Sequence, residues 1–182
     1  DTWLGEYQRM LSTPTYYRVC GELIDEVCEL FSQPRFFHLG YDEETWGNQK
    51  HYDFAAVCQH ELWWKDFFFF LETVEKQGVR PWIWGDIFWS KPEAALERIP
   101  RSVLISNWYY GDFEDDDEMR RGAFALLEGG GFDQVPTGSN WRVPDNLARM
   151  ARHCRETVAP ERLLGFMQTT WVATLPVFRE RL

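Results

Sequence analysis

Hydrophobic residues follow two different periods along this chain. Five short, continuous apolar runs are separated by longer stretches in which apolar residues recur every three or four positions. Continuous runs are typical of strands covered on both faces, and the longer period is typical of amphipathic helices. The pattern predicts strands at 36–41, 81–86, 102–108, 132–137 and 163–171. It predicts helices at 15–31, 54–77, 92–98, 118–129 and 144–157.

Proline and glycine mark the ends of several of these elements. Pro34 ends the first helix, and Gly78 follows the second in a position that tolerates a left-handed backbone. Pro136 removes a hydrogen-bond donor from the fourth strand, which we therefore expect to be weak. Helix and strand alternate throughout, which predicts an α/β fold with a parallel sheet. The length of 182 residues favours a single domain over residues 1–182.

Polar and aromatic side chains follow the end of every predicted strand. In parallel α/β folds the carboxyl ends of the strands meet at one edge, where ligands bind. We therefore expect a ligand site that combines carboxylates with aromatic rings. The side chains at these ends are Asp42, Glu43, Trp84, Asp86, Trp108, Tyr109, Tyr110, Trp141 and Trp171.

Composition and charge narrow the class of ligand. Aromatic residues make up 17% of the chain, with ten Trp among them, and surplus Trp is typical of a wall that holds a flat, partly apolar ligand. The formal charge of −10 disfavours nucleic acid and anionic membranes as partners, because both are negatively charged. The most apolar window, Phe67 to Leu71, is far too short for a membrane span.

The four cysteines show no pair at metal-binding spacing. We expect buried free thiols rather than a disulfide framework, which inclines the localisation weakly toward the reducing cytoplasm. The first residues lack the basic start and apolar run of a signal peptide. Export stays compatible with a leader removed upstream, so the localisation is left open.

Residues 38–43 read His-Leu-Gly-Tyr-Asp-Glu at the end of the first predicted strand. This sequence resembles the His-x-Gly-x-Asp-Glu signature of glycoside hydrolase family 20, the β-N-acetylhexosaminidases, which carry it after the fourth strand of a (β/α)8 barrel. The segment from Trp84 to Ile87, Trp-Gly-Asp-Ile, is similar to the family's Trp-Asp-Glu turn after the fifth strand. Trp171 is similar to the aromatic platform on the last strand.

The resemblance covers nearly the whole chain and implies a partial TIM barrel. The five predicted βα units correspond to strands 4 to 8 of the family's barrel. Five units are too few to close eight strands, which typically needs about 250 residues. The resemblance thus implies that the first three strands are missing from this sequence.

The resemblance also implies a reaction, the removal of a terminal β-linked N-acetylhexosamine or related sugar. In the family's retaining, substrate-assisted route, the acetamido oxygen of the sugar attacks the anomeric carbon. Glu43 would protonate the leaving oxygen, and Asp42 would orient the acetamido group. His38 would support the strand end, while Trp84 and Trp171 would pack against the sugar. The partner implied is a carbohydrate, without a cofactor or metal.

The chain departs from the family's pattern at three points. Tyr41 stands where the family usually has a second Gly. The Tyr-x-Asp element after the seventh strand is replaced by Gly-Ser-Asn-Trp at 138–141, so Tyr109 or Tyr110 is the candidate donor to the acetamido oxygen. The last strand reads Trp-Val-Ala at 171–173, without the family's carboxylate. These departures bear on sugar selection more than on the class of reaction.

Alternative interpretations stay open at this point. One is a non-catalytic carbohydrate-binding relative, and another is a retaining hydrolase of plain hexosides that uses Asp42 or Asp86 as nucleophile. Structurally, residues 42–44 could be a solvated helix N-terminus, and Asp86 could be an N-cap. The acidic run 112–118 lacks the glycine and spacing of a calcium loop, so we expect a solvated helix start there.

Overall fold

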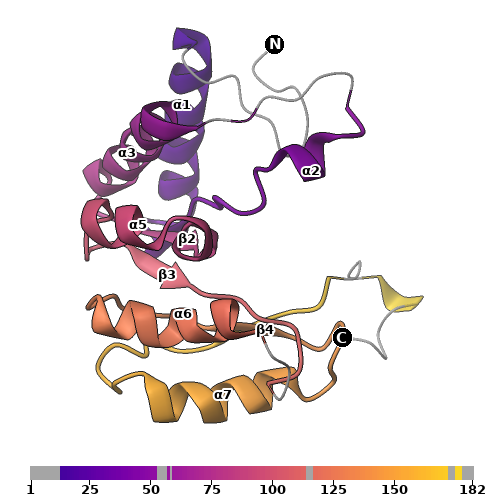
Figure 1. Ribbon diagram of the computed structural model, residues 1–182. Helices are drawn as coiled ribbons and strands as arrows, with labels where there is room; N and C mark the ends of the chain where they lie inside the picture. Colours follow the sequence, from indigo (N-terminus) through magenta and orange to yellow (C-terminus); the bar gives the residue numbers. More distant parts are fainter. Residues whose placement is uncertain (1–12, 53–56, 58, 114–116, 172–174, 178–182) are drawn as a thin grey trace. The chain divides into compact units, whose positions relative to one another are not determined.

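The structure is a computed structural model that describes residues 13–52, 57, 59–113, 117–171 and 175–177 (Figure 1). It is a mixed α/β structure with short parallel strands. The chain divides into two compact units, Asp1–Trp82 and Ile83–Leu182, and each is described by itself. The single domain over residues 1–182 stays a prediction. None of the helices in the described ranges has the length and apolar character needed to cross a membrane.

The first unit is built on two parallel strands. Its elements are α1 (Pro14–Leu30), β1 (Phe36–His38), α2 (Trp46–Gln49), α3 (His60–Lys76) and the start of β2 (Arg80–Trp84). Strand β1 pairs with β2 so that Phe36 lies opposite Arg80 and His38 opposite Trp82. Helices α1 and α3 pack against each other. The predicted strand–helix–strand order of this region is therefore confirmed.

Aromatic rings on α3 form the core of the first unit. Trp64, Phe67 and Phe70 are buried, and Trp63 stacks on Phe67 with ring centroids 5.3 Å apart. The edge of Tyr16 from α1 meets the Phe70 ring at 5.9 Å. These aromatic residues therefore serve packing, as edge-to-face and stacked pairs stabilise a core beyond the area they bury.

The second unit continues the same alternation. Its elements are α4 (Asp86–Ser90), α5 (Pro92–Arg98), β3 (Leu104–Ser106), α6 (Glu118–Gly129), β4 (Thr137–Ser139), α7 (Asn146–Thr157) and β5 (Met167–Thr169). Strands β4 and β5 pair in parallel, and parallel bridges join Ile105 to Gln134 and Trp108 to Thr137. Neighbouring strands thus follow chain order, with a helix between each pair.

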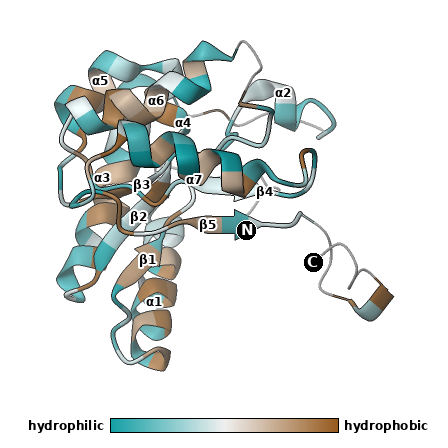
Figure 2. Ribbon diagram, turned by 90° about the horizontal axis from the view of Figure 1, so that it is seen from below, coloured by the Kyte–Doolittle hydropathy of each residue, from teal (hydrophilic) through white to brown (hydrophobic). Residues whose placement is uncertain are grey.

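The helices differ in how hydrophobic their surfaces are. Figure 2 shows α7 with a largely hydrophilic surface, whereas α1 carries hydrophobic residues along much of its length. The inner side of α7 supplies Met150 and Cys154 to a core cluster with Phe124 and Tyr109. Leu30 at the end of α1 and the C-cap residue Phe31 are more than two-thirds exposed.

Several predicted boundaries differ from the observed ones. The fourth predicted strand, 132–137, becomes β4 only from Thr137, because Pro136 has no N–H to donate to a ladder. The fifth, 163–171, is a strand only at Met167–Thr169. Helices α2 and α4 were not predicted, since four or five residues are too few to show a period. The predicted start of the second helix at Phe54 lies outside the described residues, and α3 begins at His60.

Cys28 and Cys154 are buried free thiols, as the sequence predicts. Cys20 is also buried, and Cys58 lies outside the described residues. Burial raises the pKa of the Cys154 thiol to about 12, so this side chain stays a neutral, small apolar group in the core.

Candidate functional site

The loop that carries Asp42 and Glu43 begins directly after β1 and turns sharply. Gly40, Tyr41 and Glu43 all have positive φ, at 82°, 73° and 51°. Only glycine adopts this left-handed region at low cost, so Tyr41 and Glu43 are held there by their surroundings. The turned backbone leaves Asp42 half-buried and Glu43 exposed.

His38 supports the start of this loop. Its Nδ1 accepts a hydrogen bond from the Gly40 N–H at 3.0 Å, and its ring meets that of Trp82 with centroids 4.8 Å apart. Burial lowers the pKa of His38 to about 4. The imidazole is therefore neutral at physiological pH, which is the state that its role as acceptor requires.

Tyr41 ties the middle of the loop to α3. Its side chain is 6% exposed, and its hydroxyl donates to Asp66 Oδ2 at 3.0 Å. The ring meets Trp63 and Phe67 edge-on, with centroids 5.3 and 5.4 Å apart. Tyr41 thus adopts the left-handed turn and anchors it through its side chain.

The far side of the loop is held by α2. The Glu43 carbonyl accepts from the Thr45 N–H at 2.7 Å and from Asn48 Nδ2 at 2.8 Å. Thr45 is the N-cap of α2, and its hydroxyl accepts from the Asn48 N–H at 3.3 Å. The backbone of Glu43 is therefore fixed on both sides, by Tyr41 before it and by the α2 cap after it.

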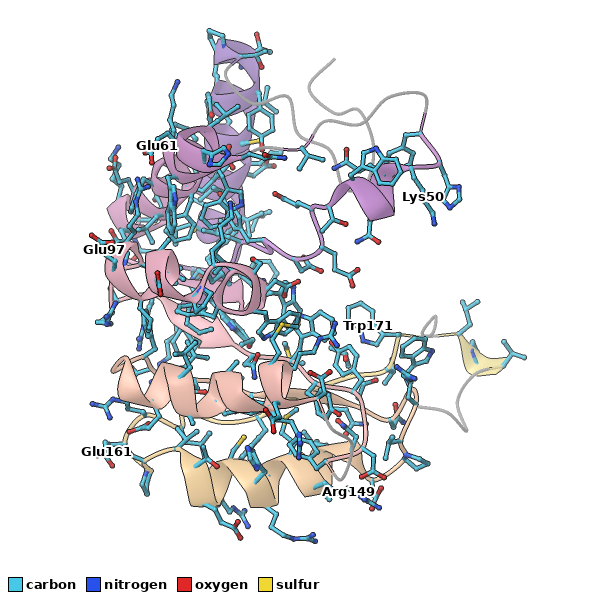
Figure 3. The ribbon with its side chains drawn as sticks, in the orientation of Figure 1. Lys50, Glu61, Glu97, Arg149, Glu161 and Trp171 are labelled. Carbon is cyan, nitrogen blue, oxygen red and sulfur yellow. The ribbon has the colours of Figure 1, made fainter. Side chains whose placement is uncertain are left out.

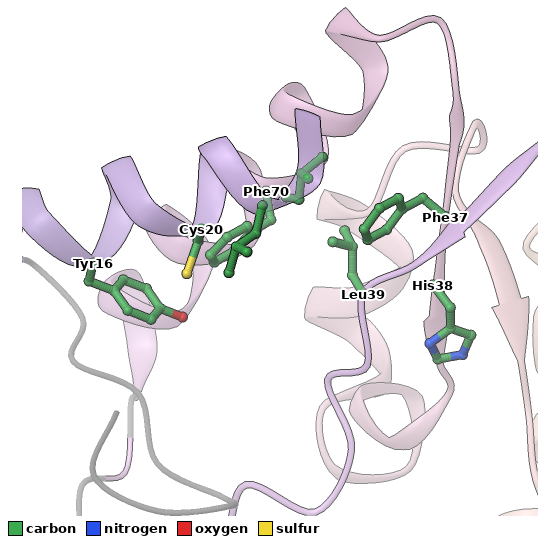
Figure 4. Close-up of a pocket in the computed structure, with 8 residues that line it drawn as sticks. Tyr16, Cys20, Phe37, His38, Leu39 and Phe70 are labelled. Atoms are coloured by element: carbon green, nitrogen blue, oxygen red, sulfur yellow. The ribbon is translucent and has the colours of Figure 1, made fainter. Parts of the chain in front are cut away.

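A separate apolar pocket of about 250 Å³ lies between α1, β1 and α3 of the first unit. Figure 4 shows Phe37 and Leu39 pointing toward Cys20 and Phe70, whereas His38 points to the other face of the strand. This alternation is the period of a β-strand. His38 and Leu39 line this pocket but Asp42 and Glu43 do not, so the pocket does not include the two carboxylates.

In the second unit, a carboxylate meets an indole after the end of β2. Asp86 is the first residue of α4, and Gly85 is its N-cap. A Cβ on Gly85 would lie 3.1 Å from the Asn107 Cα and 3.2 Å from the Ser106 carbonyl oxygen. This close approach brings α4 against the end of β3, where the Trp108 Nε1–H donates to Asp86 Oδ1 at 2.6 Å.

Trp108 is one of four aromatic residues whose rings contact one another in series. We call these residues the aromatic cluster: Trp89, Trp108, Tyr110 and Trp171 (Figure 3, in which Trp171 is labelled). Trp89 and Trp108 meet edge-on at 4.6 Å, and Trp108 and Tyr110 stack at 5.0 Å. The Tyr110 and Trp171 rings are 6.1 Å apart. Trp171 is 55% exposed, so the cluster runs from a partly buried indole to an open one.

Trp89 of this cluster and two residues that contact it were not predicted from the sequence. Trp89 lies on the short helix α4. Asn107 is wholly buried and accepts from the Trp89 Nε1–H at 2.7 Å. The Arg120 guanidinium lies 5.1 Å from the Trp89 ring centroid and 5.7 Å from that of Trp108. Asn107, directly before Trp108, is the one that its place after a strand could have indicated.

Other predicted residues are placed differently. Tyr109 is 4% exposed and its hydroxyl donates to the Asp112 carbonyl at 2.9 Å, so its ring belongs to the core and Tyr110 is the tyrosine in the aromatic cluster. Trp84 is half-buried at the end of β2. Trp141 is 59% exposed, and its N–H donates to Ser139 Oγ at 3.0 Å.

The structural alternatives for the acidic residues can also be compared with the geometry. Asp86 is not an N-cap, because Gly85 holds that position. Asp117 caps α6 by accepting from the Arg120 N–H at 3.2 Å, while 114–116 of the acidic run lie outside the described residues. Across the described ranges, no three His, Cys, Asp or Glu side chains gather as a metal site.

Chemically, each unit brings together groups that suit a polar, ring-shaped ligand. The first unit carries two adjacent carboxylates on a fixed turn, of which one is half-buried and one exposed. The second unit carries aromatic faces beside a carboxylate that accepts an indole hydrogen bond. Carboxylates serve proton transfer and hydroxyl recognition, and aromatic faces pack against the apolar C–H faces of sugars.

Comparisons with known proteins find likeness among solved structures. No protein-family model matches the chain, and a search of curated proteins finds no match. Among solved structures, the chain is similar to the crystal structure of a GH20 exo-β-N-acetylglucosaminidase from Vibrio harveyi in complex with N-acetylglucosamine, at 17% identity and a TM-score of 0.46. The alignment covers 92% of this chain and 26% of that chain. The chain thus spans about a quarter of that protein's length.

Proposed function

We propose that this chain is a glycoside hydrolase of the family 20 type, which removes a terminal β-linked N-acetylhexosamine or a related sugar with retention of configuration. The observation that carries the proposal is the loop of residues 38–43. It joins the sequence His-x-Gly-x-Asp-Glu to a left-handed turn directly after a parallel strand. In this proposal the chain corresponds to strands 4 to 8 of a (β/α)8 barrel.

Glu43 is the proposed proton donor. Cleavage of a glycosidic bond needs a proton for the departing oxygen and stabilisation of an oxocarbenium-like centre. The Glu43 side chain is exposed, while its carbonyl is fixed by Thr45 and Asn48, so the carboxyl group can meet a substrate from a rigid turn. After the first step, the same group takes a proton from the attacking water.

Asp42 is the proposed orienting carboxylate. It accepts the N–H of the acetamido group, which directs the acetamido oxygen to the anomeric carbon and leaves the protein without a covalent bond to the sugar. Asp42 lies on the same turn, and Gly40 permits this turn because L side chains rarely adopt its φ of 82°. Its half-buried position suits a carboxylate that orients rather than exchanges protons with solvent.

The aromatic cluster of the second unit is the proposed sugar-binding surface. Trp108 and Trp171 offer apolar faces, and Tyr110 offers a hydroxyl that can donate a hydrogen bond to a sugar. Asp86 holds the Trp108 indole through a 2.6 Å hydrogen bond. Trp84 and Trp141 remain proposed contacts, whereas the burial of Tyr109 takes it out of the proposed surface.

Hydrolysis of 4-nitrophenyl β-N-acetylglucosaminide tests the proposal. The Glu43→Gln variant keeps the shape of the side chain and removes the acidic proton, so we expect turnover to fall by about 10²–10⁴-fold, the usual contribution of general acid catalysis. Glu44→Gln is the matched control, because Glu44 is the adjacent carboxylate, and it should retain the wild-type rate. Equal rates for Glu43→Gln and wild type would reject the assignment.

A carbohydrate-binding protein without catalysis is the second candidate, and the aromatic cluster favours it because this surface needs no carboxylate chemistry to hold a sugar. The two candidates separate in calorimetry with N-acetylglucosamine and in the hydrolysis assay. Binding with turnover supports the hydrolase, and binding without turnover on acetamido sugars or plain hexosides supports the binding protein. Turnover of plain hexosides alone would favour a carboxylate nucleophile.

A further inference from the structure

Asn107 lies behind the aromatic cluster and connects it to α6. Its Oδ1 accepts from the Trp89 Nε1–H at 2.7 Å, and its Nδ2 donates to the Arg120 carbonyl at 2.8 Å. We infer that Asn107 is a positioning residue, which sets the orientation of the Trp89–Trp108 pair and, resting on the proposed function, the affinity of the cluster for sugar.

The surroundings of Asn107 allow one orientation of its amide. The side chain is wholly buried, so water is not an alternative partner for either end. The indole N–H can only donate and a carbonyl can only accept, which requires Oδ1 toward Trp89 and Nδ2 toward Arg120. The backbone of Asn107 is also fixed, because its carbonyl accepts from the Thr137 N–H at 2.9 Å.

Arg120 completes the support from the other side. Its guanidinium lies over the faces of both indoles, and an ion pair with Asp117 at 2.8 Å holds it there. The Asn107 amide binds the backbone of this same residue. One buried side chain therefore fixes the edge of Trp89 directly and, through Arg120, the cation over Trp89 and Trp108.

The chain offers a matched control in Asn146. It is also wholly buried, and its amide joins two backbone groups, accepting from the Ser139 N–H at 2.9 Å and donating to the Gly111 carbonyl at 2.8 Å. Neither of these hydrogen bonds involves an indole. Substitutions of the two asparagines thus disturb comparable buried networks, and only one of them touches Trp89.

The first experiment needs no sugar. It compares Asn107→Asp with Asn146→Asp by the indole N–H signals in a ¹H–¹⁵N spectrum, assigned through Trp89→Phe and Trp108→Phe. A carboxylate at position 107 still accepts from Trp89 but cannot donate to the Arg120 carbonyl. We expect the Trp89 and Trp108 signals to shift in Asn107→Asp and to stay in place in Asn146→Asp. On acidification, protonation of the new carboxyl group restores a donor, and the signals should return toward their wild-type positions.

The second experiment titrates wild type, Asn107→Asp and Asn146→Asp with N-acetylglucosamine. We expect about tenfold weaker binding by Asn107→Asp and unchanged binding by Asn146→Asp. Equal indole signals in wild type and Asn107→Asp, or equal losses of affinity in the two variants, would overturn the inference. If wild type does not bind the sugar while the indole signals still shift in Asn107→Asp, the proposed function fails and the orienting role of Asn107 stands. Should Asn107→Asp not fold, Asn107→Ser replaces it with the same expectations except the return of the signals on acidification.

Discussion

At the scale of single residues, the neutral state of His38 is the condition on which the turn before Asp42 and Glu43 depends. Its Nδ1 can accept the Gly40 N–H only while it carries no proton. Burial lowers the pKa of this imidazole to about 4. The hydrogen bond between His38 and Gly40, the first in the loop of residues 38–43, is therefore maintained by the cost of charging a buried side chain.

This predicts a pH dependence of stability. An unfolded histidine has a pKa of about 6.5, so the unfolded chain takes up a proton before the folded chain does as the pH falls. The contribution of His38 to the free energy of unfolding is thus full above about pH 6.5 and declines toward pH 4. His38→Asn keeps an acceptor near Nδ1 and cannot be charged, so its stability should decline less over this range. Urea unfolding at several pH values measures both.

His153 provides the control for this measurement. Burial, together with Arg121, also lowers its pKa, but it lies on α7 of the second unit. As the pH falls, the stability of the His153→Asn variant should still show the part of the decline that comes from His38. Parallel stability curves for wild type and His38→Asn would contradict the assignment.

At the scale of elements, Gly85 controls how closely α4 approaches β3. Its N–H donates to the Ser106 carbonyl at 2.8 Å, and any Cβ there would press against the backbone of Ser106 and Asn107. Backbone cannot move aside as a flexible side chain can. The carboxylate of Asp86 and the indole of Trp89 are both carried on this short helix, so the glycine sets the position of both.

We therefore expect Gly85→Ala to destabilise the protein by about 1–3 kcal/mol, the usual cost of overpacking a close contact, and to weaken sugar binding. Gly122→Ala is the matched control, since Gly122 lies on α6 with open space around a Cβ. Alanine there should stabilise the protein by about 0.5–1 kcal/mol through helix propensity. Thermal and urea unfolding measure both variants. A Gly85→Ala protein as stable as wild type would show that the contact is not tight.

At the scale of the whole molecule, the hydrophobic pattern predicts which elements exist better than it predicts where they end. The helix at Glu118–Gly129 has its predicted bounds, because a capping Asp and a run of glycines mark its ends. Strand β4 begins late, since Pro136 interrupts the ladder. A helix as short as α4 shows no period, so Trp89 could not be placed from the sequence.

The residues of the candidate site could likewise be predicted only in part. The His-x-Gly-x-Asp-Glu motif and the ends of the strands indicate Asp42, Glu43, Asp86 and Trp108, because the positions of these residues follow from local chain order. The role of Asn107 depends on partners from α4 and α6, which a single sequence does not reveal. Tyr109 and Tyr110 could have been separated by alternation, because neighbours in extended chain face opposite sides and only Tyr110 faces the same way as Trp108.

The acid role proposed for Glu43 is tested most directly by the dependence of the hydrolysis rate on the leaving group. A 4-methylumbelliferyl β-N-acetylglucosaminide needs a proton on its departing oxygen, whereas 2,4-dinitrophenolate leaves without one. We predict that Glu43→Gln loses about 10²–10⁴-fold in kcat/KM on the first substrate and far less on the second. Equal losses on both substrates, or no loss on either, would contradict the account.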